Sequence, residues 1–113
     1  MTTYLEGQGL FGKITFTDGT EPPYERPYLI VAVEDDYVEV LNISSLAGKE
    51  RKLAFASNKR IYKFSPPFIK PSFVKLDSLT RVPYDELKQL RILSGGATLD
   101  EEELSNIKKL LYR

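Results

Sequence analysis

Two dense runs of β-branched and aromatic residues, separated by a pair of aspartates, constrain the fold of this chain more than any other feature. The runs cover Tyr28–Val33 and Tyr37–Ile43, and Asp35-Asp36 lies between them. Residues of this kind favour strands, and a short acidic pair between two strands is typical of a tight turn. The sequence therefore predicts a β-hairpin near its centre.

Further short strands are expected on both sides of this hairpin. Apolar residues alternate with polar or small ones from Leu10 to Phe16, and alternation returns from Ser72 to Leu79. Weaker strands are expected near Lys52–Ala56 and Arg60–Phe64, and Thr17–Pro27 is predicted to be a long loop rich in turn-forming residues. Short strands at this spacing indicate a sandwich or a small barrel.

The C-terminal part changes to a helical pattern. A short helix is expected over Tyr84–Leu90, and Gly95-Gly96 breaks the chain after it. Thr98 and Glu101 have the spacing of a capping box, which predicts the start of a final helix. Its apolar stripe would either cover the barrel or contact a partner, and consists of Leu99, Leu104, Ile107, Leu110 and Leu111. The chain is thus expected to be one mainly β (α+β) domain over residues 1–113.

The composition excludes several classes of catalytic site. The chain contains 113 residues, with no histidine and no cysteine. Histidine or thiolate metal sites, Ser-His-Asp chemistry and cysteine nucleophiles are therefore excluded. The start of the chain lacks the pattern of a signal peptide, and the longest apolar run, Tyr28–Val33, is far shorter than the roughly 20 residues of a membrane-spanning helix. We expect a cytoplasmic protein without membrane contact.

The distribution of charge is more informative than its sum. Sixteen basic residues balance sixteen acidic ones, so the net charge is zero. The segment from Lys49 to Lys75, however, contains eight basic residues and only one acidic residue, Glu50. A neutral chain with a basic middle can still present a positive face to an anionic ligand.

The predicted hairpin brings an arginine close to two hydroxyl groups. A two-residue turn sets Arg26 opposite Ser45 and diagonal to Ser44, whereas a bulge or a different turn length would bring Ser44 to the side of Arg26. Opposed Cβ atoms lie about 4.5–5.5 Å apart, so a guanidinium and a serine hydroxyl can bind one phosphate here. The alternative is that Arg26 only forms an ion pair with Glu25 or Asp18.

An arginine beside a hydroxyl suits the cleavage of RNA. The ribose 2′-hydroxyl is the nucleophile, so the protein has only to bind the scissile phosphate, stabilise its developing charge and help to move protons. Arginine binds and stabilises the phosphate with a planar fork of donors, and a serine hydroxyl adds a hydrogen bond. This chemistry requires no metal, no cofactor and no histidine.

Several segments resemble the MazF/PemK (Kid) toxins of toxin-antitoxin systems. Residues 12–21 (GKITFTDGTE) and 26–31 (RPYLIV) are similar to the opening of that family: a glycine, a short strand, an acidic-glycine loop, then Arg-Pro and an aliphatic strand. Residues 70–82 (KPSFVKLDSLTRV) resemble its Ser-x-Val-x-Leu segment, and residues 84–87 and the final helix match its ending. The resemblance extends over nearly the whole chain.

This resemblance implies a fold, an activity and partners. The fold would be a small, open, Src-homology-3-like β-barrel of the MazF/CcdB/Kid type. The activity would be sequence-specific, metal-independent cleavage of single-stranded RNA to 2′,3′-cyclic phosphate and 5′-hydroxyl ends. The partners would be a second copy of the chain and a cognate antitoxin protein. The catalytic arginine of the family falls on Arg26, and its threonine falls on Ser44.

Other residues are expected to bind the RNA. Basic side chains would attract its backbone, and an aromatic residue on the loop before Arg26 would stack on an unpaired base. The expected RNA-binding residues are Lys13, Thr20, Tyr24, Lys49, Arg51, Lys52, Lys59 and Arg60.

Two alternative functions stay open at this point. The loop before Arg26 differs from the family pattern, which would suit a non-catalytic binding module on the same barrel, such as a decayed toxin or a regulator. A gyrase inhibitor of the CcdB type is the other alternative, although residues 110–113 (LLYR) match its ending poorly.

Overall fold

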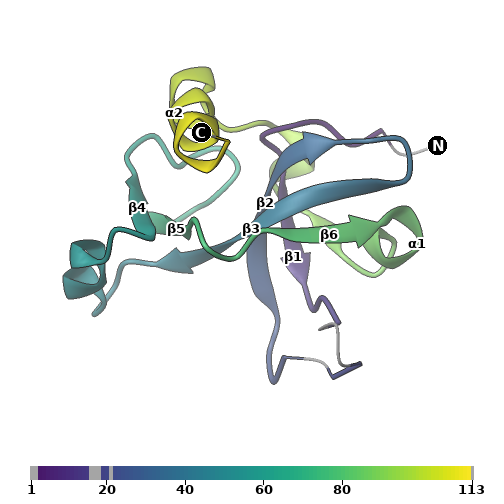
Figure 1. The fold of residues 1–113 in the computed structure, drawn as a ribbon, viewed down its shortest axis with the longest axis horizontal. Helices are drawn as coiled ribbons and strands as arrows, with labels where there is room; N and C mark the ends of the chain where they lie inside the picture. Colours follow the sequence, from purple (N-terminus) through teal and green to yellow (C-terminus); the bar gives the residue numbers. More distant parts are fainter. Residues whose placement is uncertain (1–2, 16–18, 21, 113) are drawn as a thin grey trace.

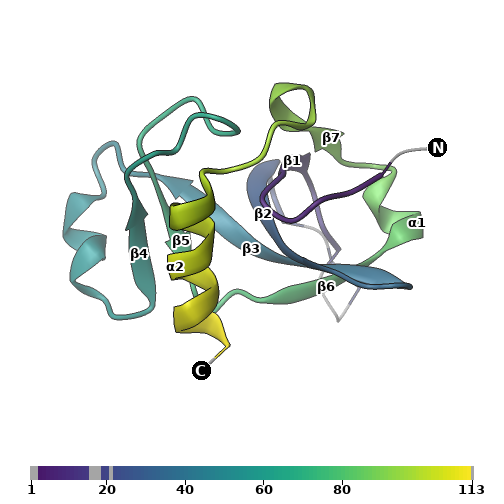
Figure 2. The same cartoon turned by 90° about the horizontal axis from the view of Figure 1, so that it is seen from above.

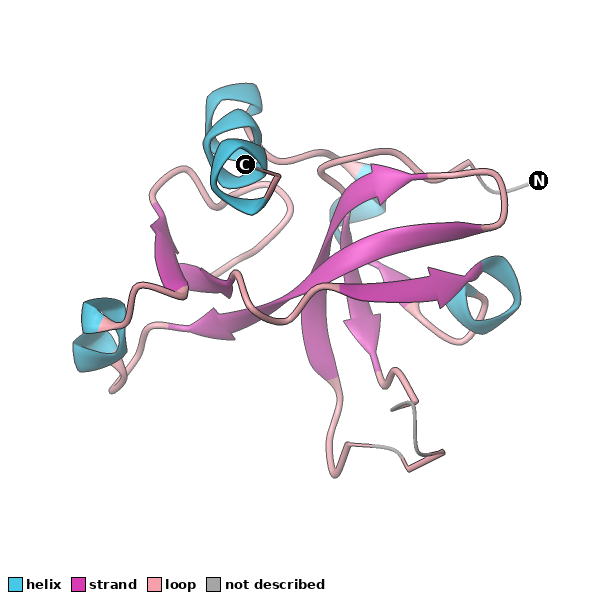
Figure 3. Ribbon diagram, in the orientation of Figure 1, coloured by secondary structure: helices cyan, strands magenta, loops and turns pink. Residues whose placement is uncertain are grey.

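The computed structural model describes residues 3–15, 19–20 and 22–112. These residues form a mainly antiparallel β structure with two α-helices and two short 3-10 helices (Figures 1 and 3), which confirms the expected fold class. The strands are β1 (Gly9–Gly12), β2 (Arg26–Val33), β3 (Tyr37–Ser45), β4 (Asn58–Ile61), β5 (Ser72–Lys75), β6 (Thr80–Pro83) and β7 (Arg91–Ile92). The helices are η1 (Glu50–Ala54), α1 (Tyr84–Leu87), η2 (Leu93–Gly96) and α2 (Glu101–Leu111).

The predicted hairpin is confirmed and forms the centre of the sheet. The strand order is β4-β5-β3-β2-β1-β7, with β6 pairing the same strand, β3, as β5 does. The main-chain N–H of Glu34 donates to the carbonyl of Tyr37 over 2.9 Å and closes the turn at Asp35-Asp36. Leu29, Ile30 and Val31 are fully buried in succession because both faces of β2 are covered. This explains why β2 reads as a continuous apolar run.

A β-bulge interrupts the hairpin. Near the turn Val33 pairs with Val38, but beyond the irregularity between Ile30 and Ala32 the pairing has moved by one residue, and Tyr28 pairs with Asn42. The extra residue is Val31, which has no partner on β3. Because strand residues alternate between the two faces, a shift of one residue exchanges which face a given pair occupies.

Strand β3 changes partners along its other edge. Its residue Val40 pairs with Thr80 of β6, whereas Ile43 pairs with Val74 of β5. Only residues 41 and 42 lie between these pairs on β3, while residues 75–79 lie between them on the other side. The surplus residues leave the ladder, and the Ser78 hydroxyl accepts from the main-chain N–H of residue 42 over 2.8 Å in place of a backbone partner.

The two faces of the sheet carry separate apolar clusters. The cluster on the first face consists of Leu10, Ile14, Tyr28, Ile30, Val38, Val40, Val82, Leu87 and Leu90. The cluster on the second face lies beneath α2 and consists of Leu29, Val31, Leu41, Ile43, Ile61, Phe68, Val74, Leu99 and Ile107. Helix α2 lies across β3, β4 and β5, whereas α1 lies beyond the far end of β6 (Figure 2). The α2 stripe therefore packs on the sheet, although Leu110 is 37% exposed.

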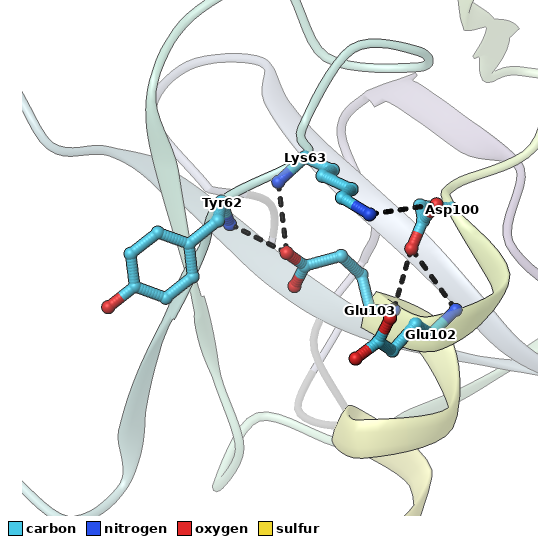
Figure 4. A network of polar contacts seen from close by, with 5 residues as sticks. All are labelled: Tyr62, Lys63, Asp100, Glu102 and Glu103. Carbon is cyan, nitrogen blue, oxygen red and sulfur yellow. Dashed lines mark hydrogen bonds and ion pairs between the residues drawn. The ribbon is translucent and has the colours of Figure 1, made fainter.

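A buried carboxylate fixes α2 to the strand region that follows β4. Glu103 is only 7% exposed, and its Oε1 accepts the main-chain N–H groups of Tyr62 and Lys63 over 3.0 and 2.9 Å (Figure 4). The helix begins after Asp100, whose side chain accepts from the N–H groups of residues 102 and 103. The predicted capping box at Thr98 is therefore wrong by two residues.

Other local predictions also need correction. The weak strand expected near Lys52–Ala56 does not form, because residues 52–54 belong to the 3-10 helix η1 and residues 55–56 to the bend and turn after it. The strand expected over Arg60–Phe64 begins earlier, at Asn58, and ends at Ile61. The segment Ser72–Leu79 is not one strand, because the chain turns after Lys75. Phe16 lies outside the described residues. No helix in the described part of the chain has the length and apolar character needed to cross a membrane.

Candidate functional site

Arg26 lies at the mouth of a groove on the sheet face opposite α2. It is the first residue of β2 and pairs with Gly12 of β1, at the end of the hairpin far from the turn. The groove has a volume of about 500 Å³. Its lining residues are Ile14, Thr15, Pro22, Arg26, Tyr28, Asn42, Asp77, Ser78, Leu79, Thr80 and Arg81.

The bulge decides which serine shares a face with Arg26. Tyr28 pairs with Asn42, so the two side chains point to the same face. Arg26 lies two residues before Tyr28 on β2, and Ser44 lies two residues after Asn42 on β3, so each of them points to that face as well. Arg26 and Ser44 therefore lie on one face of the sheet. The register that set Ser45 opposite Arg26 is corrected, because Val31 adds one residue to β2. Ser45 faces the other side, where its hydroxyl accepts from the N–H of Ala47 over 3.3 Å.

The guanidinium of Arg26 contacts an exposed tyrosine. Its Nη2 donates to Tyr24 Oη over 3.1 Å, and its Cζ lies 4.6 Å from the centre of the Tyr24 ring. The ion pairs of the described residues include neither Arg26 nor Glu25. Asp18, the other expected partner, lies outside the described residues. The positive charge of Arg26 is thus stacked on an aromatic ring, which leaves donors of the guanidinium open to an anion.

A lysine approaches the hydroxyl of Ser44. Lys49 Nζ donates to Ser44 Oγ over 3.3 Å, which places an ammonium group directly beside the serine. Lys49 precedes η1, and the next turn of the chain carries the exposed residues Arg51 and Lys52. Of the expected RNA-binding residues in this segment, Lys49 therefore lies beside Ser44.

Lys75 is a basic residue of this site that the sequence analysis did not select. Val74 belongs to the cluster beneath α2, so Lys75, its neighbour on β5, points to the opposite face, which is that of Arg26. Burial lowers the pKa of Lys75, and the charges of Arg26, Lys52 and Lys49 lower it further, while Asp77 raises it. The charges of three other basic side chains, Arg26, Lys49 and Lys52, therefore reach Lys75.

Tyr28 forms part of the apolar floor of the groove. Its side chain is 4% exposed. Burial raises the pKa of Tyr28, although a hydrogen bond with the backbone of Ile14 and the charge of Arg26 lower it in part. The phenol therefore stays protonated near neutral pH and lies close to the guanidinium.

The remaining expected RNA-binding residues are spread over more than one surface. Lys59 pairs with Val74 and so lies on the α2 side of the sheet, away from Arg26. Arg60 shares the face of Arg26, and its Cζ stacks 5.0 Å from the Tyr62 ring centre. Lys13 and Thr20 both belong to the connection between β1 and β2, with Lys13 directly after the residue that pairs with Arg26.

Three polar residues of the groove had no clear signal in the sequence. Asn42, Asp77 and Ser78 line it, and they meet because β3 changes partners at this point. Asp77 is exposed at the turn after β5, whereas the Ser78 hydroxyl is engaged with the backbone. The alternation over Ser72–Leu79 indicated which residues point inward, but not that this segment borders the Arg26 end of the hairpin.

A comparison of this chain with protein-family models finds no match, and a comparison with curated proteins finds none either.

Proposed function

We propose that this protein is an endoribonuclease that cleaves single-stranded RNA without a metal ion or cofactor, leaving 2′,3′-cyclic phosphate and 5′-hydroxyl ends. The observation that carries the proposal is the shared sheet face of Arg26 and Ser44, with Lys49 Nζ 3.3 Å from the serine hydroxyl. A phosphate bound there would meet a planar guanidinium, a hydroxyl and an ammonium group. Such a set of donors stabilises the negative charge that develops on a phosphate during in-line attack.

The groove supports the same proposal through its shape and surroundings. Arg26 and Asn42 line it together with the partly apolar side chain of Tyr28, a combination that suits a phosphate with an attached base. The exposed ring of Tyr24 stacks on Arg26 and is available for stacking on an unpaired base. In this proposal Arg26 binds and stabilises the phosphate, Ser44 donates a hydrogen bond to it, and the basic segment after Ser44 holds the RNA backbone.

The biological setting follows from the resemblance to the MazF/PemK toxins. We propose a small, open barrel of the Src-homology-3 type, a homodimer, and a role as the cytoplasmic toxin of a toxin-antitoxin pair. A cognate antitoxin would then cover the groove around Arg26. Expression of the chain alone would arrest growth, and expression of a short neighbouring reading frame would restore it.

Incubation of the purified protein with a long RNA in EDTA tests the activity directly. We expect discrete cuts whose upstream fragments end in a cyclic phosphate. Arg26→Ala should reduce the rate by at least about 100-fold, the scale of losing an oxyanion-stabilising donor. Arg91→Ala is the matched control, because Arg91 is an exposed arginine on β7 that stacks on Phe11. Absence of discrete cuts, or equal cutting by Arg26→Ala and wild type, would overturn the proposal.

One observation favours a second candidate, a non-catalytic RNA-binding module. The guanidinium of Arg26 is already engaged by the Tyr24 hydroxyl over 3.1 Å, so a phosphate must compete with that contact. Filter binding and cleavage measured on the same RNA distinguish the two functions. Binding that depends on Arg26 without any cutting would establish the second candidate in place of the first.

A further inference from the structure

Lys75 lies on β5 between Phe73, which pairs with Ser44, and Asp77, which lines the groove. It is the last residue of β5, it pairs with Asn58 of β4, and it points to the face of the sheet that carries Arg26 and Ser44. Its side chain is only partly exposed.

The backbone around Lys75 is tied to the centre of the site. The Ser78 hydroxyl donates to the carbonyl of Lys75 over 2.6 Å and accepts from the N–H of Asn42 over 2.8 Å. Asn42 in turn pairs with Tyr28, two residues from Arg26. One serine hydroxyl therefore links the end of β5 to the strand pair that carries the arginine, which limits how far Lys75 can move from it.

The electrostatic surroundings of Lys75 differ from those of an ordinary surface lysine. Burial and the charges of Arg26, Lys52 and Lys49 all lower its pKa, and the charge of Asp77 opposes them. A lysine with a lowered pKa gives up its proton more readily than a free lysine, whereas an arginine keeps its proton throughout the ordinary pH range and is a much weaker acid. The chain has no histidine. Lys75 shares the sheet face of Ser44, because Phe73, two residues before it on β5, pairs with Ser44. This position and its lowered pKa make Lys75 suited to donate a proton there.

The proposed reaction needs such a donor. Attack by the ribose 2′-oxygen forms a new bond to phosphorus, the bond from phosphorus to the 5′-oxygen breaks, and the 2′-hydroxyl proton passes to water. The departing 5′-oxygen is an alkoxide, so its protonation as the bond breaks accelerates the reaction. The ammonium of Lys75 supplies that proton and is reprotonated from solvent.

We propose that Lys75 is the general acid that protonates the 5′-oxygen leaving group. This role rests on the proposed endoribonuclease activity. It assigns the proton transfer to a residue separate from Arg26 and Ser44, which bind and stabilise the phosphate.

A substrate with a better leaving group tests this role. A short RNA containing the mapped cleavage site is made with either oxygen or sulfur at the 5′-bridging position, because a thiolate leaves without protonation. Lys75→Met should slow cleavage of the oxygen substrate about 100- to 10,000-fold, the usual contribution of general acid catalysis, but that of the sulfur substrate less than about tenfold. The rate on the oxygen substrate should also fall as pH rises through the pKa of Lys75, and the sulfur substrate should lack this fall.

Three further proteins make the outcome decisive. Lys75→Arg keeps the charge but is too weak an acid, so it should show the same difference between the substrates. Arg26→Ala should slow both substrates, and Lys70→Met, a change at an exposed loop lysine, should slow neither. Equal losses on both substrates for Lys75→Met and Lys75→Arg, or no loss on either, would overturn the role of Lys75 while leaving the nuclease intact. Failure of the wild-type protein to cut any RNA would overturn the proposed function and this role together.

Discussion

The contact between Glu103 and the chain after β4 gives a quantitative test of how α2 is held. The Glu103 carboxylate accepts two main-chain N–H groups, over 3.0 and 2.9 Å, in a site where the residue is 7% exposed. Hydrogen bonds to a charged group contribute about 1.5–3 kcal/mol each, and water partly replaces them here because Tyr62 is 68% exposed. We therefore expect Glu103→Ala to lower the free energy of unfolding by about 2–4 kcal/mol.

Urea unfolding followed by circular dichroism measures this loss. Glu103→Gln keeps an acceptor oxygen and loses only the charge, so it should cost about half as much as Glu103→Ala. The matched control is Glu102→Ala, one residue away and exposed, for which we expect about 0.5 kcal/mol or less from the lost interaction with the helix dipole. If Glu103→Ala destabilised the protein no more than Glu102→Ala, the two hydrogen bonds would not hold the helix as described.

Three further predictions concern the helix cap, the C-terminus and the site. Asp100→Ala should lower the free energy of unfolding by about 1 kcal/mol and Thr98→Ala by much less, because Asp100 caps α2. A larger loss for Thr98→Ala in urea unfolding would show that Thr98 is the capping residue instead. Burial and a hydrogen bond to Glu39 raise the pKa of Tyr112 above its ordinary value of 10.0. The protonated phenol therefore contributes fully to the free energy of unfolding below pH 10, and this contribution is lost as the pH rises through the raised pKa. The stability of the wild type should thus fall more steeply above pH 10 than that of Tyr112→Phe, and parallel curves would contradict this. Ser44→Ala should slow RNA cleavage at least about tenfold and Ser45→Ala less than about twofold; equal effects in the EDTA assay would reject the bulge-based assignment.

The central hairpin was predictable because its signals are local. Strand propensity, the acidic turn and the buried run at Leu29–Val31 all depend on residues close in sequence, and each is confirmed. The start of α2 was predicted two residues too early because Thr98 and Asp100 both suit an N-cap, and only the packing of Glu103 against residues 62–63 decides between them. Arg51 and Lys52 gave no local sign of the 3-10 helix η1 in which they lie.

The arrangement of the site depended on two features that the sequence does not display. The bulge at Val31 moves the register by one, and an apolar run buried on both faces gives no alternation from which to detect it. The position of Lys75 depends on the pairing of β5 with β3, segments separated by about thirty residues in the sequence. Arg26 was identified because the hairpin register and the Arg-Pro pattern around it are local in the sequence, whereas Lys75 was not, because its neighbours in the fold are distant in the sequence.

The exchange of partners along β3 has a consequence for how this fold can diversify. Residues 76–79 leave the ladder between β5 and β6, and they contribute Asp77, Ser78 and Leu79 to the groove. Both flanking ladders are complete without the side chains of this segment, and its tie to β3 requires only a short hydroxyl at position 78. Residues 77 and 79 can therefore be randomised in a library to alter ligand preference while the scaffold keeps its stability. Within this segment, Leu76 and Ser78 hold the chain in place, whereas Asp77 and Leu79 line the groove.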